Sequence, residues 1–264
     1  MTVVAIADAL SGGRMRQRFH AEPLVQATEL LLQERVPREV AVAHHWAAEV
    51  RTARAIFAEE QAGQRRLTSA QQAVPATHLL SNGSFTTQLT AAGSGSLRWR
   101  GLAVTRWRED ATCDDLGAYI LLRDVRTGAV WSATTQPMGC APDACVISFN
   151  EDRAEFLRQE GFIATQLEII VSAEDDGEVR RLSITNNGTT TCEIEVTSYA
   201  ELVLARQADD MAHPAFSKLF VQTEYLPEPG ILLATRRPRG PEEPSIWAAH
   251  FAVVEGDTIG PQQV

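Results

Sequence analysis

The fold is decided by three consecutive segments, FIATQLEIIV (162–171), VRRLSIT (179–185) and CEIEVTSY (192–199). They are rich in β-branched and aromatic residues, which fit the pleated surface of a sheet. The turn residues Asn186-Asn187-Gly188 separate the second segment from the third. Apolar and polar residues alternate in the third segment, so we expect an antiparallel strand with one face in water.

Similar short segments continue on both sides of this stretch, from about residue 76 to the C-terminal region. Many strands spaced by turn signals, with almost no helical periodicity, predict a mainly β fold, a large antiparallel sandwich. The further segments are YILL (119–122), AVWS (129–132), LFVQTE (219–224), ILLAT (231–235) and IWAAHFAVV (246–254).

Residues 1–75 lack this alternation and are rich in Ala, Leu, Gln, Glu and Arg, which favour helices. Residues 1–10 predict a buried helix that ends at a Ser-Gly-Gly break, and amphipathic helices are predicted over 21–35 and about 39–61. Residues 62–75 are polar, end in proline and predict a linker. We expect the chain to be a piece of a longer polypeptide.

Composition excludes several classes of function. The 34 acidic and 24 basic side chains give a net charge of −10, which argues against nonspecific binding to nucleic acid. No stretch approaches the roughly 18 apolar residues of a membrane span. The four cysteines form no CxxC pair and have no histidine at metal-ligand spacing. We therefore expect no metal, no nucleic-acid partner and no membrane contact.

Arginine and tryptophan are concentrated in residues 98–108, which we call the Arg/Trp patch: it holds four Arg and two Trp within eleven residues. Trp offers a flat face for a sugar ring, and Arg offers a planar donor fork for hydroxyls, carboxylates or phosphate. One interpretation is a carbohydrate-facing patch. The alternative is a strand pair with Trp in the core and Arg paired to Glu109, Asp110, Asp114 or Asp115. The candidate binding residues are Arg98, Trp99, Arg106 and Trp107.

A second candidate is the connection DDMAHPAFSKLF (209–220) between two predicted strands. Function is often carried by loops that a rigid scaffold holds. The alternative is a solvated loop anchored by Phe216 and Phe220. The candidate binding residues here are His213, Phe216, Ser217 and the only lysine, Lys218.

Paired carboxylates are abundant but give no catalytic assignment. Glycoside chemistry needs two positioned carboxyl groups, or one acid and an external nucleophile. The pairs lie in or near predicted turns, where they favour solubility. They are Asp114/Asp115, Glu151/Asp152, Asp175/Asp176 and Glu242/Glu243.

Several segments resemble the β-domain of bacterial cyclic β-1,2-glucan synthases, a domain shared with inverting glycoside phosphorylases such as the cellobiose and chitobiose enzymes. They include residues 78–125, EVRRLSITNNG (178–188), EIEVTSYAELVLA (193–205), HPAFSKLFVQTEY (213–225) and IWAAHFAVVEG (246–256). Residues 2–37 resemble the end of the preceding glucoamylase-like helical domain.

The resemblance implies three parts. Residues 1–37 are the helical tail, 38–77 a helix and linker, and 78–264 a β-super-sandwich of galactose-mutarotase-like type. It also implies that the general acid and the phosphate site lie on a later (α/α)₆ barrel, which this chain lacks. We therefore assign no catalytic residue and no cofactor to this chain. For the parent protein it implies UDP-glucose as donor, inorganic phosphate, and a place at the cytoplasmic face of the bacterial inner membrane.

The same resemblance implies that the loop around HPAFSKLF (213–220) reaches toward the sugar site. The family typically has Asn-Phe-Gln-Arg where this chain has Ala215-Phe216-Ser217-Lys218. Lysine is a point charge rather than a fork, which puts a bidentate sugar contact in doubt.

We thus expect a non-catalytic domain that positions β-1,2-glucan and packs on the barrel. One alternative is a stand-alone glucan-binding module, which requires Trp99 and Trp107 to be exposed. Another is a docking or homodimer surface, which an apolar patch larger than a few hundred Å² would favour. An epimerase would need a histidine and a carboxylate in one cleft, and His213 and His250 have no identifiable partner.

Overall fold

The computed structural model describes residues 2–23, 25–26, 64–72, 74–108, 114–238, 240, 243 and 245–256. The chain divides into two compact units, residues 1–58 and 59–264. Most of the two predicted amphipathic helices, over 21–35 and about 39–61, lies outside the described residues.

The first unit contains helices α1 (Thr2–Leu10) and α2 (Arg14–His20). The predicted break lies between them, where Gly12 and Gly13 adopt positive φ. The helix over residues 1–10 is confirmed, but its predicted burial is wrong, since Val4 and Leu10 are exposed. Among the described residues its neighbour is α2, which is mostly polar and has no buried residue. No described helix combines the length and apolar character needed to cross a bilayer.

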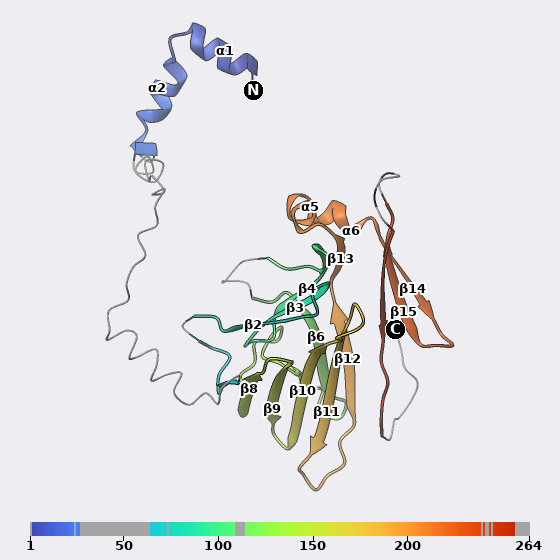
Figure 1. The fold of residues 1–264 in the computed structure, drawn as a ribbon. Coiled ribbons are helices and arrows are strands. Elements are labelled where there is room, and N and C mark those ends of the chain that lie inside the picture. Colours follow the sequence, from blue (N-terminus) through green and yellow to red (C-terminus); the bar gives the residue numbers. More distant parts are fainter. Residues whose placement is uncertain are drawn as a thin grey trace. The chain divides into compact units, whose positions relative to one another are not determined.

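The second unit is built almost wholly from antiparallel strands, which confirms the predicted fold class (Figure 1). One five-stranded sheet has the spatial order β1 (Arg65–Leu67), β8 (Ala144–Phe149), β9 (Arg153–Glu160), β10 (Ile163–Val171) and β11 (Glu178–Asn186). The other has the order β13 (Leu202–Ala205), β5 (Leu102–Thr105), β4 (Gly95–Trp99), β3 (Phe85–Thr90) and β2 (Thr77–Ser81).

Two three-stranded sheets and two short helices complete this unit. One sheet has the order β12 (Ile194–Ala200), β6 (Ala118–Asp124) and β7 (Val130–Ser132), the other β14 (Val221–Leu226), β15 (Ile231–Arg236) and β16 (Ile246–Phe251). The helices α5 (Gln207–Ala212) and α6 (Pro214–Lys218) follow β13 (Figure 1). They form the connection that the sequence predicts as a loop.

The main core lies between the two large sheets and β6–β7. Its buried apolar residues come from β2, β3 and β6–β10, including Leu122, Phe149 and Leu167. Burial alternates along β10, where Ile163, Leu167 and Ile169 face inward. Side chains two residues apart thus place one face of this strand in the core.

Two expectations about this unit are corrected. Residues 65–67 form β1 and pair with β8 instead of belonging to a linker. The Arg65 guanidinium lies 5.3 Å from the centre of the Phe149 ring, so a polar segment covers the core edge. In β12 every residue after Ile194 is exposed, on both faces, so the expected strand with only one face in water is not formed here.

Candidate functional site

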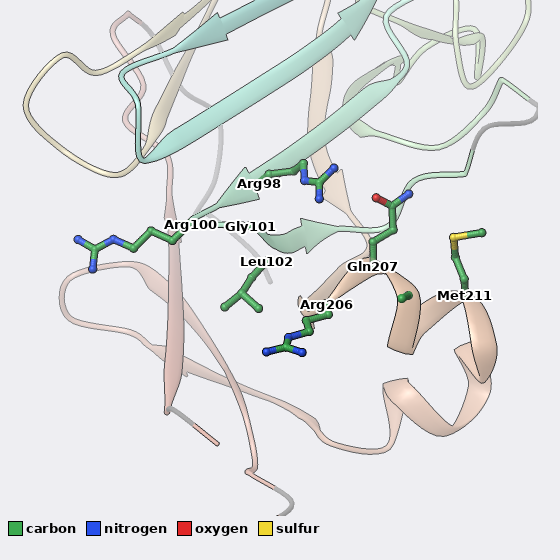
Figure 2. A pocket seen from close by; sticks show the side chains of 8 residues that line it. Arg98, Arg100, Gly101, Leu102, Arg206, Gln207 and Met211 are labelled. Atoms are coloured by element: carbon green, nitrogen blue, oxygen red, sulfur yellow. The ribbon is translucent and has the colours of Figure 1, made fainter. Parts of the chain in front are cut away.

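An open groove of about 690 Å³ lies between the β4–β5 turn and the start of α5 (Figure 2). Both regions that the sequence singles out contribute to it. The residues that line it are Arg98, Arg100, Gly101, Leu102, Arg206, Gln207, Ala208 and Met211.

One wall is the two-residue turn that joins β4 to β5. Trp99 pairs with Leu102, and the residues between them, Arg100 and Gly101, have φ of 46° and 83°. Two successive left-handed residues match the right-handed twist of a hairpin, where Asn-Gly or Gly-Gly is usual. Gly101 adopts this conformation freely, whereas the side chain of Arg100 makes it sterically costly.

Contacts with the β10–β11 connection hold this turn in place. The Arg100 guanidinium lies 5.0 Å from the centre of the Trp99 ring, and Trp99 Nε1 donates to Asp176 Oδ2 at 2.5 Å. Ser84 Oγ donates to the same carboxylate. These hydrogen bonds, from Ser84 and then Trp99, hold the pKa of Asp176 below its ordinary value, and the charge of Arg100 adds to the effect.

The other wall depends on a β-bulge in β13. Leu202 pairs with Thr105 and Ala205 with Ala103, so β13 holds one residue more than β5 over this interval. Leu204 has φ of 52°, and it is buried together with Val203 and Ala205. A bulge bends its strand and redirects the chain that follows, here into Arg206 and α5.

A buried ionic network fastens α5 to the sheet. Arg106 donates to both carboxylate oxygens of Asp210, from Nε at 2.8 Å and from Nη2 at 2.6 Å. Its Nη1 donates to Glu201 Oε1 at 2.6 Å, and its Nη2 to the Pro214 carbonyl at 3.2 Å. The hydrogen bonds to Asp210 raise the pKa of Arg106. Each nitrogen of this guanidinium donates a hydrogen bond, so Arg106 has a structural role and fixes the position of α5.

The network connects the two candidate regions of the sequence. Lys218 forms an ion pair with Glu201, the carboxylate that also accepts from Arg106. Arg106 belongs to the Arg/Trp patch and Lys218 to the connection after β13. Long-range contact between the two regions is thus a feature of the fold that neither segment indicates alone.

The remaining residues of the 209–220 connection have different environments. His213 is exposed between α5 and α6 and has no side-chain partner among the described residues. Phe216 is 52 % exposed and packs edge-to-face on Phe220, with 5.1 Å between the ring centres. Ser217 is buried, and Arg236 Nη1 donates to its carbonyl at 3.0 Å. Ser217 therefore anchors α6, while His213 and Phe216 stay open to a ligand.

The Arg/Trp patch divides in the same way. Arg98 is exposed and lines the groove, while Trp99 and Trp107 are half-buried. The alternative interpretation expects arginines of this patch to be paired with Glu109, Asp110, Asp114 or Asp115. Glu109 and Asp110 lie outside the described residues, and the described partners of Arg106, Asp210 and Glu201, are 104 and 95 residues away.

Sequence reasoning missed Arg100, Arg206 and Met211 as groove residues. Arg100 had a usable signal, because an X-Gly pair between two short β-prone runs indicates a two-residue turn. Arg206 and Met211 had none, because the bulge at Leu204 and the fastening of α5 bring them to the groove.

The acidic pairs take structural roles in the described part of the chain. Asp114 accepts from Ser94, Asp152 pairs with Arg153, and Glu243 lies near Arg236. Asp176 holds the β4–β5 turn. None of these carboxylates is among the described residues that line the groove.

The family of the chain follows from a match over its β unit. The sequence model of the family "Glycosyl hydrolase 94, supersandwich domain" matches residues 61–262. The chain belongs to this family. The predicted super-sandwich and the resemblance to cyclic glucan synthases are thereby confirmed.

The chain is also similar to two curated proteins. The chain is 40 % identical, over 95 % of its length, to the cyclic beta-(1,2)-glucan synthase NdvB of Rhizobium meliloti, of which it covers 9 %. It is 29 % identical, over 46 % of its length, to the N,N'-diacetylchitobiose phosphorylase of Vibrio furnissii, of which it covers 16 %. The chain thus spans less than a fifth of either relative and is a carbohydrate-associated domain related to the glucan synthases.

Proposed function

We propose that this supersandwich domain positions β-1,2-glucan for a neighbouring catalytic domain and does not itself make or break glycosidic bonds. One observation carries the proposal: the described residues that line the groove include three arginines and no carboxylate. Binding a sugar needs donors, whereas glycoside chemistry also needs a positioned acid. The relationship to a glucan synthase and a phosphorylase supports the substrate class.

The lining of the groove suits one or two sugar units. Its volume falls within the range of small-molecule sites, roughly 300–1,000 Å³. Arg98 and Arg206 offer donors to hydroxyls, and Gln207 offers both a donor and an acceptor. Leu102 and Met211 offer an apolar surface for the faces of a sugar ring. Phe216 is the candidate aromatic contact in the adjoining connection.

This proposal places the chemistry elsewhere in the parent protein. The general acid and the inorganic phosphate would be held by a phosphorylase-type (α/α)₆ barrel, and UDP-glucose by a glycosyltransferase domain. The parent would act at the cytoplasmic face of the inner membrane, as the relationship to glucan synthases suggests.

Calorimetric titration with linear β-1,2-gluco-oligosaccharides tests the proposal. We expect saturable binding that Arg98→Ala weakens about tenfold, since a hydrogen bond from a charged donor contributes roughly 1.5 kcal/mol or more. Arg123→Ala is the matched control, because Arg123 is an exposed arginine on β6 paired to Glu195, outside the groove. Equal affinity of the wild type and Arg98→Ala for the oligosaccharide would show that the groove does not bind glucan.

The outer face of β14–β15–β16 favours docking as a second candidate function. Trp247 and Phe251, on the same face of β16, are 61 % and 63 % exposed. Ala249 lies between them, and Leu233 of β15 is its cross-strand partner. Among the described strands β16 lies at the edge of its sheet, which leaves a row of its backbone groups without a partner in another described strand.

A second copy of the chain is the occupant we would test, because two β16 edges can pair with each other. Sedimentation velocity over a range of concentrations should then show a dimer that Trp247→Lys abolishes. A monomer at all concentrations would rule this docking mode out.

A further inference from the structure

We infer that the groove is an oxyanion site, so that the ligand it holds carries a phosphate or carboxylate group. This inference concerns the groove of the proposed function and goes beyond that function, because an unsubstituted β-1,2-glucan carries neither group. Three of the eight lining residues are arginines and none is acidic, in a chain with a net charge of −10. Neutral hydroxyls do not require such a concentration of positive charge, whereas an oxyanion does.

Two arginines of the groove differ from the ion-paired arginines of the β unit. Arg98 and Arg206 are exposed and have no carboxylate partner among the described residues. In Figure 2, Arg98 extends from β4 on the side of Gln207, and Arg206 extends from the start of α5 on the side of Leu102. By contrast, ion pairs to carboxylates occupy Arg106, Arg123, Arg153, Arg158 and Arg180.

Arg100 adds charge at the rim of the groove. Its guanidinium is held over the Trp99 ring, and its nearest carboxylate contact, with Asp176, is a long 3.8 Å. It extends from the turn in a different direction from Arg98 (Figure 2). We therefore assign direct anion contact to Arg98 and Arg206, and a supporting electrostatic role to Arg100.

Backbone strain is an independent observation that points to the same place. In the described part of the chain, only Arg100 and Leu204 combine positive φ with a side chain. Arg100 lines the groove, and Leu204 precedes the groove residue Arg206 by two positions. Asn or Gly would form the β4–β5 turn at lower steric cost. Residues kept in strained conformations cluster at ligand sites, where the strain fixes the geometry.

The test titrates the full chain with inorganic phosphate, acetate and neutral β-1,2-gluco-oligosaccharide in separate calorimetric experiments. We expect phosphate or acetate to bind saturably, with affinity at least tenfold weaker in Arg98→Gln and in Arg206→Gln. Arg98→Lys should lose part of this affinity, because it keeps the charge without the planar fork. Whichever anion binds more tightly identifies the group on the ligand.

The control is Arg123→Gln, which removes the same charge outside the groove. Equal weakening in this control would reveal general charge attraction and overturn the inference. If the neutral glucan binds but neither anion binds or competes with it, the inference is overturned and the proposed function stands. Anion binding without glucan binding would instead support the oxyanion site and rule out glucan as a ligand of the groove. All substituted arginines are exposed, so unchanged thermal unfolding should confirm that the variants fold.

Discussion

The main core and the groove region of the β unit are stabilised by different interactions. The core cluster contains apolar residues from seven strands, among them the fully buried Leu122. Around the groove the buried apolar clusters hold only three residues each, and the buried pair of Arg106 and Asp210 lies beside them. The comparison teaches that alternating apolar residues build the scaffold, while a long-range ionic network and strained backbone shape the site.

Removal of Arg106 should have the largest effect. Arg106→Ala leaves Asp210 buried without a counter-charge, and breaking a buried pair in this way costs about 3–5 kcal/mol. We expect the free energy of unfolding to fall by that amount in urea titrations. Glucan binding should also be lost, because α5 is no longer held beside the groove.

A double variant shows whether the charge or the packing is responsible. Arg106→Met with Asp210→Leu removes both charges of the buried pair, and Glu201 keeps Lys218 as its partner. We expect this variant to recover most of the lost stability, because apolar residues often replace a buried ion pair without cost. A loss as large as that of Arg106→Ala would refute the charge-based explanation.

Truncation in the main core should come next. Leu122 is 0 % exposed, so Leu122→Ala should lower the free energy of unfolding by about 3 kcal/mol through lost burial and a residual cavity. In contrast to Arg106→Ala, the properly folded fraction should still bind glucan with wild-type affinity. Weakened binding by that fraction would show that the core and the groove are coupled, and would contradict their separate roles in stability and binding.

The two regions also differ in what the sequence predicts. The strands around β10 and β11 follow from β-prone residues and turn residues, because both signals are local. The bulge at Leu204 and the pairing of Arg106 with Asp210 depend on contacts between distant segments. The sequence singles out two segments, 98–108 and 209–220, that both contribute residues to the groove. It could not show that Arg106 and Ser217 are buried supports, or that Arg206 lines the groove.

Relief of backbone strain should have a smaller, opposite effect on stability. Arg100→Asn removes the left-handed penalty of about 1–2 kcal/mol but also the contact with Trp99, worth about 0.5–1 kcal/mol. We expect a net gain of roughly 0.5 kcal/mol in thermal or urea unfolding, together with weaker anion binding. A variant that gains stability and keeps full anion affinity would show that the strain serves no ligand.

Acid should produce the smallest effect, localised at Asp176. The lowered pKa of this carboxyl means that its stabilising contribution is present above its ordinary pKa of 3.8. The contribution is lost as the pH falls through the lower value of the folded state, because protonation weakens the bonds from Ser84 and Trp99. Trp fluorescence should report a transition below pH 3.8 that Asp176→Asn lacks. The same transition in both proteins would assign it to another group.

Hydrogen–deuterium exchange with and without linear β-1,2-gluco-oligosaccharide shows directly whether glucan binds in the groove. If the groove is the glucan site, exchange should slow in residues 98–108 and 206–218 and stay unchanged along β16. Protection confined to β16, or no protection in either groove segment at saturating glucan, would contradict glucan binding in the groove.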